Sequence, residues 1–200
     1  IENAFASRVN MMRRWNANAA ISGGGVLIDN GTHAVDILRF FLGKLRDIQV
    51  IEGRRIQGLA VEDTVRVFVR NDDGVMGTSD LSWSIDKELD TYLRIYGSDG
   101  TILVGWKESK YRRRDDPQWH VFGSGYNKVQ AFRSQLVNFC EAIQGKAELV
   151  ITARDALASV EVISAAYAAL ERSRWQDIAS RIEDVAPPLS AVPAHPLEAV

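Results

Sequence analysis

The sequence predicts an α+β fold in which an open, mostly antiparallel sheet carries its helices on one face. Three observations support this. A series of β-type segments follows one amphipathic helix, hairpin-type turns separate neighbouring segments, and two further helices come after the last strand. Because strands and helices occur in separate runs, the pattern differs from the alternation that a parallel βαβ sheet requires. We expect one face of the sheet to lack a helical cover.

The first predicted helix covers residues 25–42 and has two unlike faces. At about 100° per residue, Asp29, His33 and Asp36 form one polar stripe. The opposite, apolar face holds Leu27, Ala34, Leu38, Phe41 and Leu42. Gly31 falls on this apolar face, where glycine costs about 1 kcal/mol relative to alanine, so we expect close packing on a sheet to compensate. The polar stripe can then face a cleft while the helix stays docked.

Glycines mark both ends of this helix. Gly23, Gly24 and Gly25 precede it and supply backbone freedom and room for another backbone or a ligand to approach. Gly43 follows the last helical residue and is a natural C-cap.

The β-type segments that follow form a meander. Val65, Val67 and Val69 alternate with polar residues, as expected of a strand with one buried face. Gly-containing turns at 71–74 and 97–100 predict antiparallel hairpins. The expected strands cover 46–57, 61–70, 75–85, 90–97 and 101–106.

Two helices, at 127–144 and 153–172, complete the predicted domain, which we place at residues 1–185. Thr152 and Asp155 have the spacing of a capping box at the start of the second helix. Four of the five prolines lie in the last 14 residues, so we expect the segment 186–200 to be an extended or disordered tail.

Composition and charge argue against several classes of function. A formal net charge of −2 gives no electrostatic footprint for nucleic acid or an anionic membrane, and we expect the basic run 112–114 to be a solvated hairpin or loop. No apolar run approaches the length of a membrane span. The single cysteine, Cys140, lies on the apolar side of a predicted helix, which indicates a structural thiol and a cytoplasmic protein. Because the chain starts at Ile1 rather than methionine, we expect further residues upstream.

Several segments together resemble one enzyme family. The run from Gly23 through Asp29 and His33 to Asp36 resembles the substrate-domain motif of the glucose-fructose oxidoreductase, inositol dehydrogenase and rhizopine catabolism family of NAD(P)-dependent dehydrogenases. Other matching segments follow the family order: Trp15, the run 61–64, Ser82 with Trp83, the turn 96–100, and the closing helix through Trp175. The resemblance covers residues 11–178.

The resemblance implies a C-terminal domain separated from its usual partner. In the family, an N-terminal Rossmann domain carries the glycine-rich dinucleotide loop and a catalytic lysine, and this chain contains neither. The resemblance therefore implies that NAD or NADP is bound mainly by a domain missing from this chain. It also implies a small polyhydroxy substrate, and a homo-oligomer formed through the open face of the sheet.

His33 and Asp29 are the predicted catalytic pair. Oxidation of a secondary alcohol needs a base, and histidine ordinarily titrates near pH 6.5, at about the right point to take and return that proton. Asp29, one turn earlier, could bind a substrate hydroxyl or orient the imidazole. The resemblance assigns the same roles to these positions. A structural histidine, or a zinc site built on this i, i+4 pair, are the alternatives; no third ligand is evident, and we predict no metal.

Five further residues are candidates for the substrate site. Trp15, Asn16 and Arg13 precede the glycines and could border a polyol, although a tryptophan packed over a helix start explains Trp15 equally well. Tyr126 and Asn127, just before the long helix, could reach the same cleft. Asp36 is expected to be a helix-face partner of Arg39, and Glu62 and Asp63 to close a hairpin or pair with Arg54 or Arg55.

Two functions are consistent with the sequence. The first is the substrate-binding and oligomerisation domain of an NAD(P)-dependent oxidoreductase acting on a sugar, inositol or related polyol, inactive alone. The alternative is a stand-alone, non-catalytic dimerisation or polyol-binding module. A dinucleotide fingerprint upstream of Ile1 would favour the first.

Overall fold

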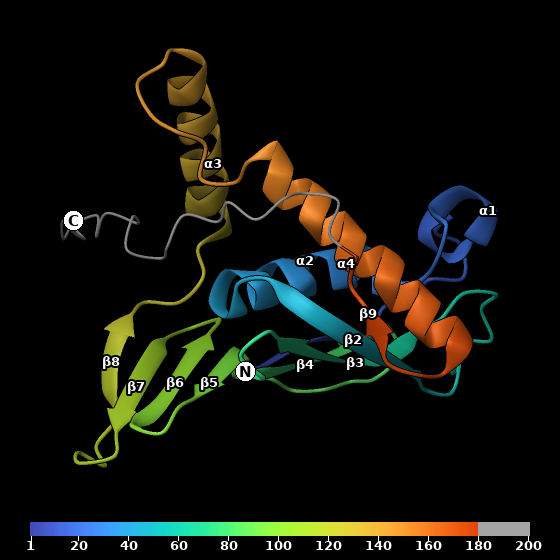
Figure 1. Cartoon of the computed structure of the whole chain (residues 1–200), viewed down its shortest axis with the longest axis horizontal. Helices are drawn as coiled ribbons and strands as arrows, with labels where there is room; N and C mark the ends of the chain where they lie inside the picture. The colour runs from blue at the N-terminus through green and yellow to red at the C-terminus, as the bar shows by residue number, and fades with distance from the viewer. Residues whose placement is uncertain (180–200) are drawn as a thin grey trace.

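One large sheet organises the chain, and the computed structural model describes residues 1–179 of it (Figure 1). Its strand order is β8-β7-β6-β5-β1-β4-β3-β2-β9. All pairings are antiparallel except that of β1 with β4. The α+β prediction is confirmed, and the predicted tail 186–200 lies outside the described residues.

Five strands correspond to the sequence prediction, and four of them are shorter than predicted. They are β2 (Leu45–Glu52), β3 (Thr64–Asn71), β4 (Met76–Ser82), β5 (Thr91–Tyr96) and β6 (Gly100–Gly105). The β3–β4 and β5–β6 pairs are the hairpins expected from the two turns.

Four strands were not predicted. They are β1 (Glu2–Ala6), β7 (Ser109–Arg113), β8 (His120–Gly123) and β9 (Gln176–Asp177). Strand β1 pairs in parallel with β4, far away in the sequence, so no hairpin turn announces it. The basic run 112–114 is exposed and begins at the end of β7, in the β7–β8 hairpin.

Three long helices accompany the sheet. They are α2 (Val26–Leu42), α3 (Lys128–Ile143) and α4 (Ala153–Arg172), and all three were predicted. The expected capping box of Thr152 with Asp155 starts α4, and Gly43 ends α2 with a positive φ of 71°. Two short elements, η1 (Trp15–Ala17) and α1 (Ala19–Ser22), precede α2 and were missed.

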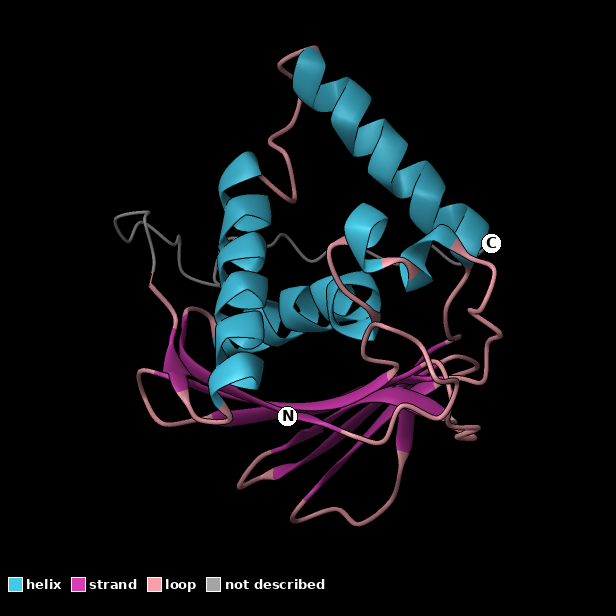
Figure 2. Cartoon of the chain, turned by 90° about the vertical axis from the view of Figure 1, so that its right-hand side faces the viewer, coloured by secondary structure: helices cyan, strands magenta, loops and turns pink. Residues whose placement is uncertain are grey.

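The helices lie on one side of the sheet, as Figure 2 shows. Helix α2 packs on β1, β3 and β4, and α4 packs on β2 and on α2 itself. Gly31 allows this close packing because its Cα faces the side chains of Leu81 in β4 and Ile163 in α4. The buried core lies between these elements and includes Leu27, Ala34, Leu38, Ile48, Val67 and Ala166.

Helix α3 stands away from this core (Figure 1), and none of its residues is buried. Cys140 is therefore exposed rather than packed, because the apolar side of its helix meets no core. The structural role expected for this thiol is not found. In residues 1–179, no helix has the length and apolarity to span a membrane.

Candidate functional site

The exposed face of α2 carries the predicted polar stripe. His33 is exposed and Asp29 and Asp36 are half-buried, while Leu27, Ala34 and Leu38 on the opposite face are fully buried. Phe41 departs from the prediction: it is 37% exposed and packs edge-on against Phe40, with ring centroids 4.9 Å apart. The helix therefore docks through one face and leaves the part of the stripe with Asp29 and His33 at the surface.

Asn16 and Asp29 come together at the start of this stripe. The Asn16 Nδ2 donates to Asp29 Oδ1 at 3.2 Å, which links η1 to the first turn of α2. Trp15, the neighbour of Asn16, is 63% exposed, and Arg13 is exposed as well. The packing of Trp15 over the helix start, weighed as an alternative, leaves most of its side chain in contact with solvent.

Tyr126 and Asn127 have contacts of their own. The Tyr126 ring meets Trp106 edge-on, with centroids 5.9 Å apart. The Asn127 Oδ1 accepts from the Gln130 amide at 3.0 Å and caps the start of α3. Among the residues described, no hydrogen bond or ring contact joins this pair to Asp29 or His33. Asn127 is thus a helix cap, a role that its position before a helix could have suggested.

Asp36 takes part in the packing of α2 against α4. Ser159 donates to Asp36 Oδ1 at 3.3 Å and accepts from Arg39 Nη1 at 3.0 Å. The same arginine nitrogen donates to the Asp155 carbonyl at 2.9 Å. Asp36 and Arg39 are therefore partners through Ser159, which fits the expected structural role.

The glycines before α2 make room for protein groups. Gly23 has a φ of +79°, a conformation that suits glycine. A Cβ at position 24 would overlap the Tyr167 hydroxyl, and one at position 25 would overlap the Glu62 carbonyl oxygen. The sequence predicted that these glycines make room either for another part of the chain or for a ligand. The structure shows the close approach of another part of the chain.

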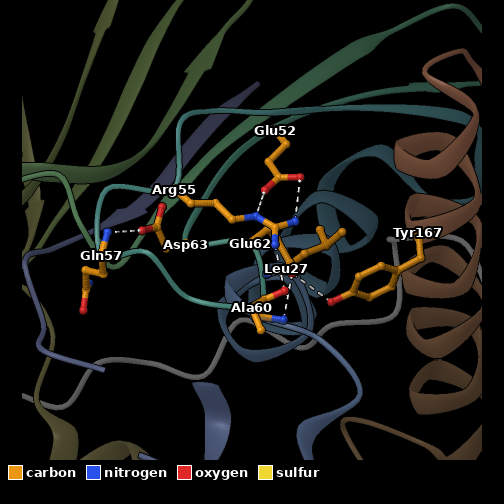
Figure 3. Close-up of polar contacts among 9 residues, drawn as sticks. Leu27, Glu52, Arg55, Gln57, Ala60, Glu62, Asp63 and Tyr167 are labelled. Atoms are coloured by element: carbon orange, nitrogen blue, oxygen red, sulfur yellow. Dashed lines mark hydrogen bonds and ion pairs between the residues drawn. The ribbon is translucent and has the colours of Figure 1, made fainter. Parts of the chain in front are cut away.

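Glu62 occupies the place where a helix N-terminus would hold an anion. Its Oε1 accepts from the amides of Gly25 at 2.9 Å and Leu27 at 3.1 Å, as Figure 3 shows in part. In dinucleotide-binding folds, the backbone amides at the corresponding place, between a glycine-rich turn and the helix that follows it, hold the pyrophosphate. These residues do not fit a dinucleotide phosphate, because a carboxylate of the chain already uses the donors.

Glu62 and Asp63 stand just before β3, at the end of the connection between β2 and β3, as expected of residues that close a hairpin. The alternative, an ion pair with Arg54 or Arg55, is not found among the described residues. Arg55 pairs with Glu52 instead, while Glu62 caps α2 and Asp63 Oδ2 accepts from the Gln57 amide at 2.9 Å (Figure 3). Both acids are buried. The signal that could have found Glu62 is a helix that starts at glycine and so lacks a capping side chain of its own.

The pair of Asp29 and His33 has no further metal-ligating neighbour. In the described part of the chain, no group of three or more histidine, cysteine, aspartate or glutamate side chains could hold a metal ion. His120 lies in β8, and its Nε2 forms a hydrogen bond with Asp116 Oδ2 at 2.7 Å. The zinc interpretation therefore lacks a third ligand among these residues.

Comparison with known families gives a match over most of the chain. The family described as "Oxidoreductase family, C-terminal alpha/beta domain" (Gfo/Idh/MocA) matches residues 3–178. Among curated protein sequences, none matches this chain.

Solved structures share the fold at low sequence identity. A levoglucosan dehydrogenase in complex with NADH and levoglucosan has a TM-score of 0.79 and 15% identity, over 89% of this chain and 57% of that one. An NAD-binding oxidoreductase from Klebsiella pneumoniae has a TM-score of 0.77 and 17% identity, over 90% of this chain and 58% of its own. A third structure is an oxidoreductase from Agrobacterium radiobacter in complex with NAD+, L-tartaric acid and magnesium. It has a TM-score of 0.74 and 16% identity, over 88% of this chain and 56% of its own. This chain thus spans less than three-fifths of each structure.

Proposed function

Because the chain belongs to the Gfo/Idh/MocA oxidoreductase family as a C-terminal alpha/beta domain, we propose that it is the substrate-binding and oligomerisation domain of an NAD(P)-dependent oxidoreductase. The substrate class is a sugar, an inositol or a related polyol. The observation that carries the proposal is the exposed stripe on α2, where Asp29 and His33 lie one turn apart on a helix held by its other face.

His33 is the proposed base and Asp29 the proposed substrate anchor. In the oxidation of a secondary alcohol, the bound nicotinamide supplies the acceptor for the hydride. The hydroxyl proton then passes to the His33 imidazole, which its exposed position leaves accessible to a substrate. Asn16 holds Oδ1 of Asp29 by a 3.2 Å hydrogen bond, so the carboxylate is oriented to accept a second bond from a substrate hydroxyl.

The dinucleotide, NAD or NADP, is proposed to bind mainly to a domain outside this chain, and the chain alone is proposed to be inactive. Two observations support this. Glu62 uses the amide donors at the glycine turn, and the chain spans less than three-fifths of the solved oxidoreductases that it resembles. Trp15, Arg13 and Tyr126 are proposed to border the substrate, since all three are exposed.

The ligands of the structural neighbours support a polyhydroxy substrate. Levoglucosan and L-sorbose bind one neighbour, and L-tartaric acid binds another. Each presents adjacent hydroxyl groups, the kind of group that a carboxylate and an imidazole on one helix face can bind.

Oligomerisation is proposed through the open face of the sheet. Val65, Val67 and Val69 face the core, so alternate residues of β3 point to the side without helices. Apolar side chains on that side come from Ile51, Phe68 and Met76. A second copy would cover them. We also propose a cytoplasmic protein, because a single cysteine suits a reducing compartment.

The test of this function is mutation of the stripe in the protein that carries both this chain and a dinucleotide-binding domain. We expect His33→Ala and Asp29→Ala each to lower kcat by about 100-fold or more, in the range of general acid–base catalysis, with levoglucosan, L-sorbose and myo-inositol as trial substrates. The dissociation constant for NAD or NADP is expected to stay unchanged, because the other domain holds it.

Asp36→Asn is the matched control, since Asp36 lies on the same helix but contacts Ser159. This variant is expected to keep normal turnover. Equal losses of turnover and dinucleotide affinity in His33→Ala would contradict the assignment, and turnover by the isolated 200-residue chain would refute its proposed inactivity.

A further inference from the structure

Helix α2 begins with a residue that cannot cap it. Its N-cap is Gly25, which has no side chain to accept a hydrogen bond from the first turn. Serine, threonine, aspartate or asparagine would normally serve there. None of them fits, because a Cβ at this position would overlap the Glu62 carbonyl oxygen. The free amides at the start of the helix must therefore find acceptors elsewhere.

Glu62 provides those acceptors from a distant part of the chain. Its carbonyl oxygen accepts from the Val26 amide at 2.9 Å. Its carboxylate Oε1 accepts from the amides of Gly25 and Leu27 at 2.9 and 3.1 Å. The residue is 4% exposed, so water does not compete for these bonds. One residue thus satisfies three successive amides, through its main chain and its side chain.

Tyr167 of α4 completes this arrangement. Its hydroxyl donates to Glu62 Oε1 at 2.9 Å, and Figure 3 shows the Tyr167 side chain pointing from α4 toward this region. Burial and the nearby Glu62 charge raise the pKa of Tyr167, so the hydroxyl keeps its proton and remains a donor. Gly24 is needed here, since any larger residue would overlap this hydroxyl.

Asp29 lies in the turn that this cap holds. The amide of Asp29 donates to the Gly25 carbonyl at 3.1 Å, the first hydrogen bond inside the helix. Core side chains hold both turns, Val26 and Leu27 in the first and Ala34 and Leu38 beyond it, but only the amides of the first turn depend on Glu62. Loss of the cap would loosen the first turn and displace Asp29 more than His33.

We propose that Glu62, with Tyr167 as its partner, is a positioning residue that sets the start of α2 and so the place of Asp29. The inference rests on the proposed function for its catalytic consequence. It assigns no contact between Glu62 and the substrate. The effect is transmitted through the backbone of 25–29.

The first test uses the 200-residue chain and amide hydrogen exchange. We expect Glu62→Ala to speed exchange at Leu27 by about fivefold or more, as loss of a cap of ordinary strength would. Glu62→Gln should restore most of the protection, because the amide keeps a carbonyl acceptor. Tyr167→Phe should have a smaller effect, since it removes one of the three bonds to Oε1.

Glu52→Ala is the matched control. Glu52 lies in the same corner of the molecule (Figure 3) but pairs with Arg55 rather than with α2. Its loss should leave exchange at Leu27 unchanged. Equal exchange rates in Glu62→Ala and Glu52→Ala would overturn the capping role.

The second test uses the protein that also carries a dinucleotide-binding domain. We expect Glu62→Ala to lower kcat by about 100-fold, the cost of a misplacement near 1 Å, with dinucleotide affinity unchanged and Glu62→Gln rescuing the loss. If Glu62 acts through Asp29, the double variant Glu62→Ala with Asp29→Ala should have the same kcat as Asp29→Ala alone. Additive losses would overturn the proposal. Failure of the proposed function would appear separately, as normal turnover in Asp29→Ala and His33→Ala.

Discussion

The two ends of the sheet are built differently. Strands β1 to β4 lie under α2 and α4, whereas β5 to β8 extend beyond them (Figure 1). Between residues 84 and 161, no hydrophobic side chain belongs to this core cluster, although Leu93 of β5 is buried outside it. Helix α3, which follows β8, has five apolar residues that are all at least half exposed: Val129, Phe132, Leu136, Phe139 and Ile143.

This difference determines where apolar burial stabilises the chain. The covered region buries its apolar side chains within one chain and places Asp29 and His33 on a rigid helix. The uncovered region keeps apolar and aromatic side chains in contact with solvent, an arrangement typical of surfaces that meet a partner or another domain. Mutations should therefore act on the stability of the chain in the first region and much less in the second.

Truncation of one apolar side chain in each region gives the largest expected contrast. Leu38→Ala, at a fully buried position, should lower the free energy of unfolding by about 3 kcal/mol. Phe132→Ala, at a position 53% exposed, should change it by less than about 0.5 kcal/mol. Urea unfolding of both variants measures the difference. A comparable loss in Phe132→Ala would show that α3 packs within the chain.

Removal of one carboxylate charge in each region should give a smaller contrast that depends on pH. Burial raises the pKa of Asp47, but hydrogen bonds from Arg70 and Arg46 outweigh it, and the pKa lies below its ordinary value. Asp47 therefore contributes stability above the pKa that it has in the unfolded chain, and loses it as the pH falls through the lower folded value. We expect Asp47→Asn to cost about 2 kcal/mol at pH 7 and progressively less on acidification.

Asp116 provides the comparison in the uncovered region. The His120 hydrogen bond lowers the pKa of this exposed carboxyl. Because the pair lies in solvent, the urea midpoint of Asp116→Asn should equal that of the unsubstituted chain at each pH from 7 to 3. A midpoint that fell as far as in Asp47→Asn would contradict the division into two regions.

Helix ends give the smallest expected effects. Ser173 ends α4 with a φ of 53°, the left-handed conformation that favours glycine. Ser173→Gly should raise the free energy of unfolding by about 0.5 kcal/mol, because α4 packs on the core.

At the end of α3, Gly145 has a φ of 69°. Gly145→Ala should loosen that helix end without moving the thermal midpoint of the core, and a shared shift of the midpoint would weaken the comparison.

Much of the fold could be predicted because its signals are local. The two faces of α2 follow from the spacing of its apolar residues, the capping box of α4 from Thr152 and Asp155, and the β3–β4 hairpin from its turn. The residues of the stripe follow from the same periodicity, and the resemblance of the motif identified the family.

Other features depend on partners far apart in the sequence. Strand β1 has no adjacent hairpin partner and pairs with β4, 76 residues away at Glu2 and Thr78. The apolar periodicity of α3 predicted the helix correctly but not its exposure, and so misplaced Cys140. Helical periodicity indicates which residues share a face but not whether anything covers that face.

Residues within one helix, one hairpin or one motif were enough to predict the three long helices, five of the strands, the polar stripe of α2 and the family. The packed chain was needed to show that Glu62 and Tyr167 hold the start of α2 and that Asn16 bonds Asp29. The physical reason is that buried amides and carboxylates take their partners from whatever the packed chain brings within about 3 Å, whatever the separation along the sequence.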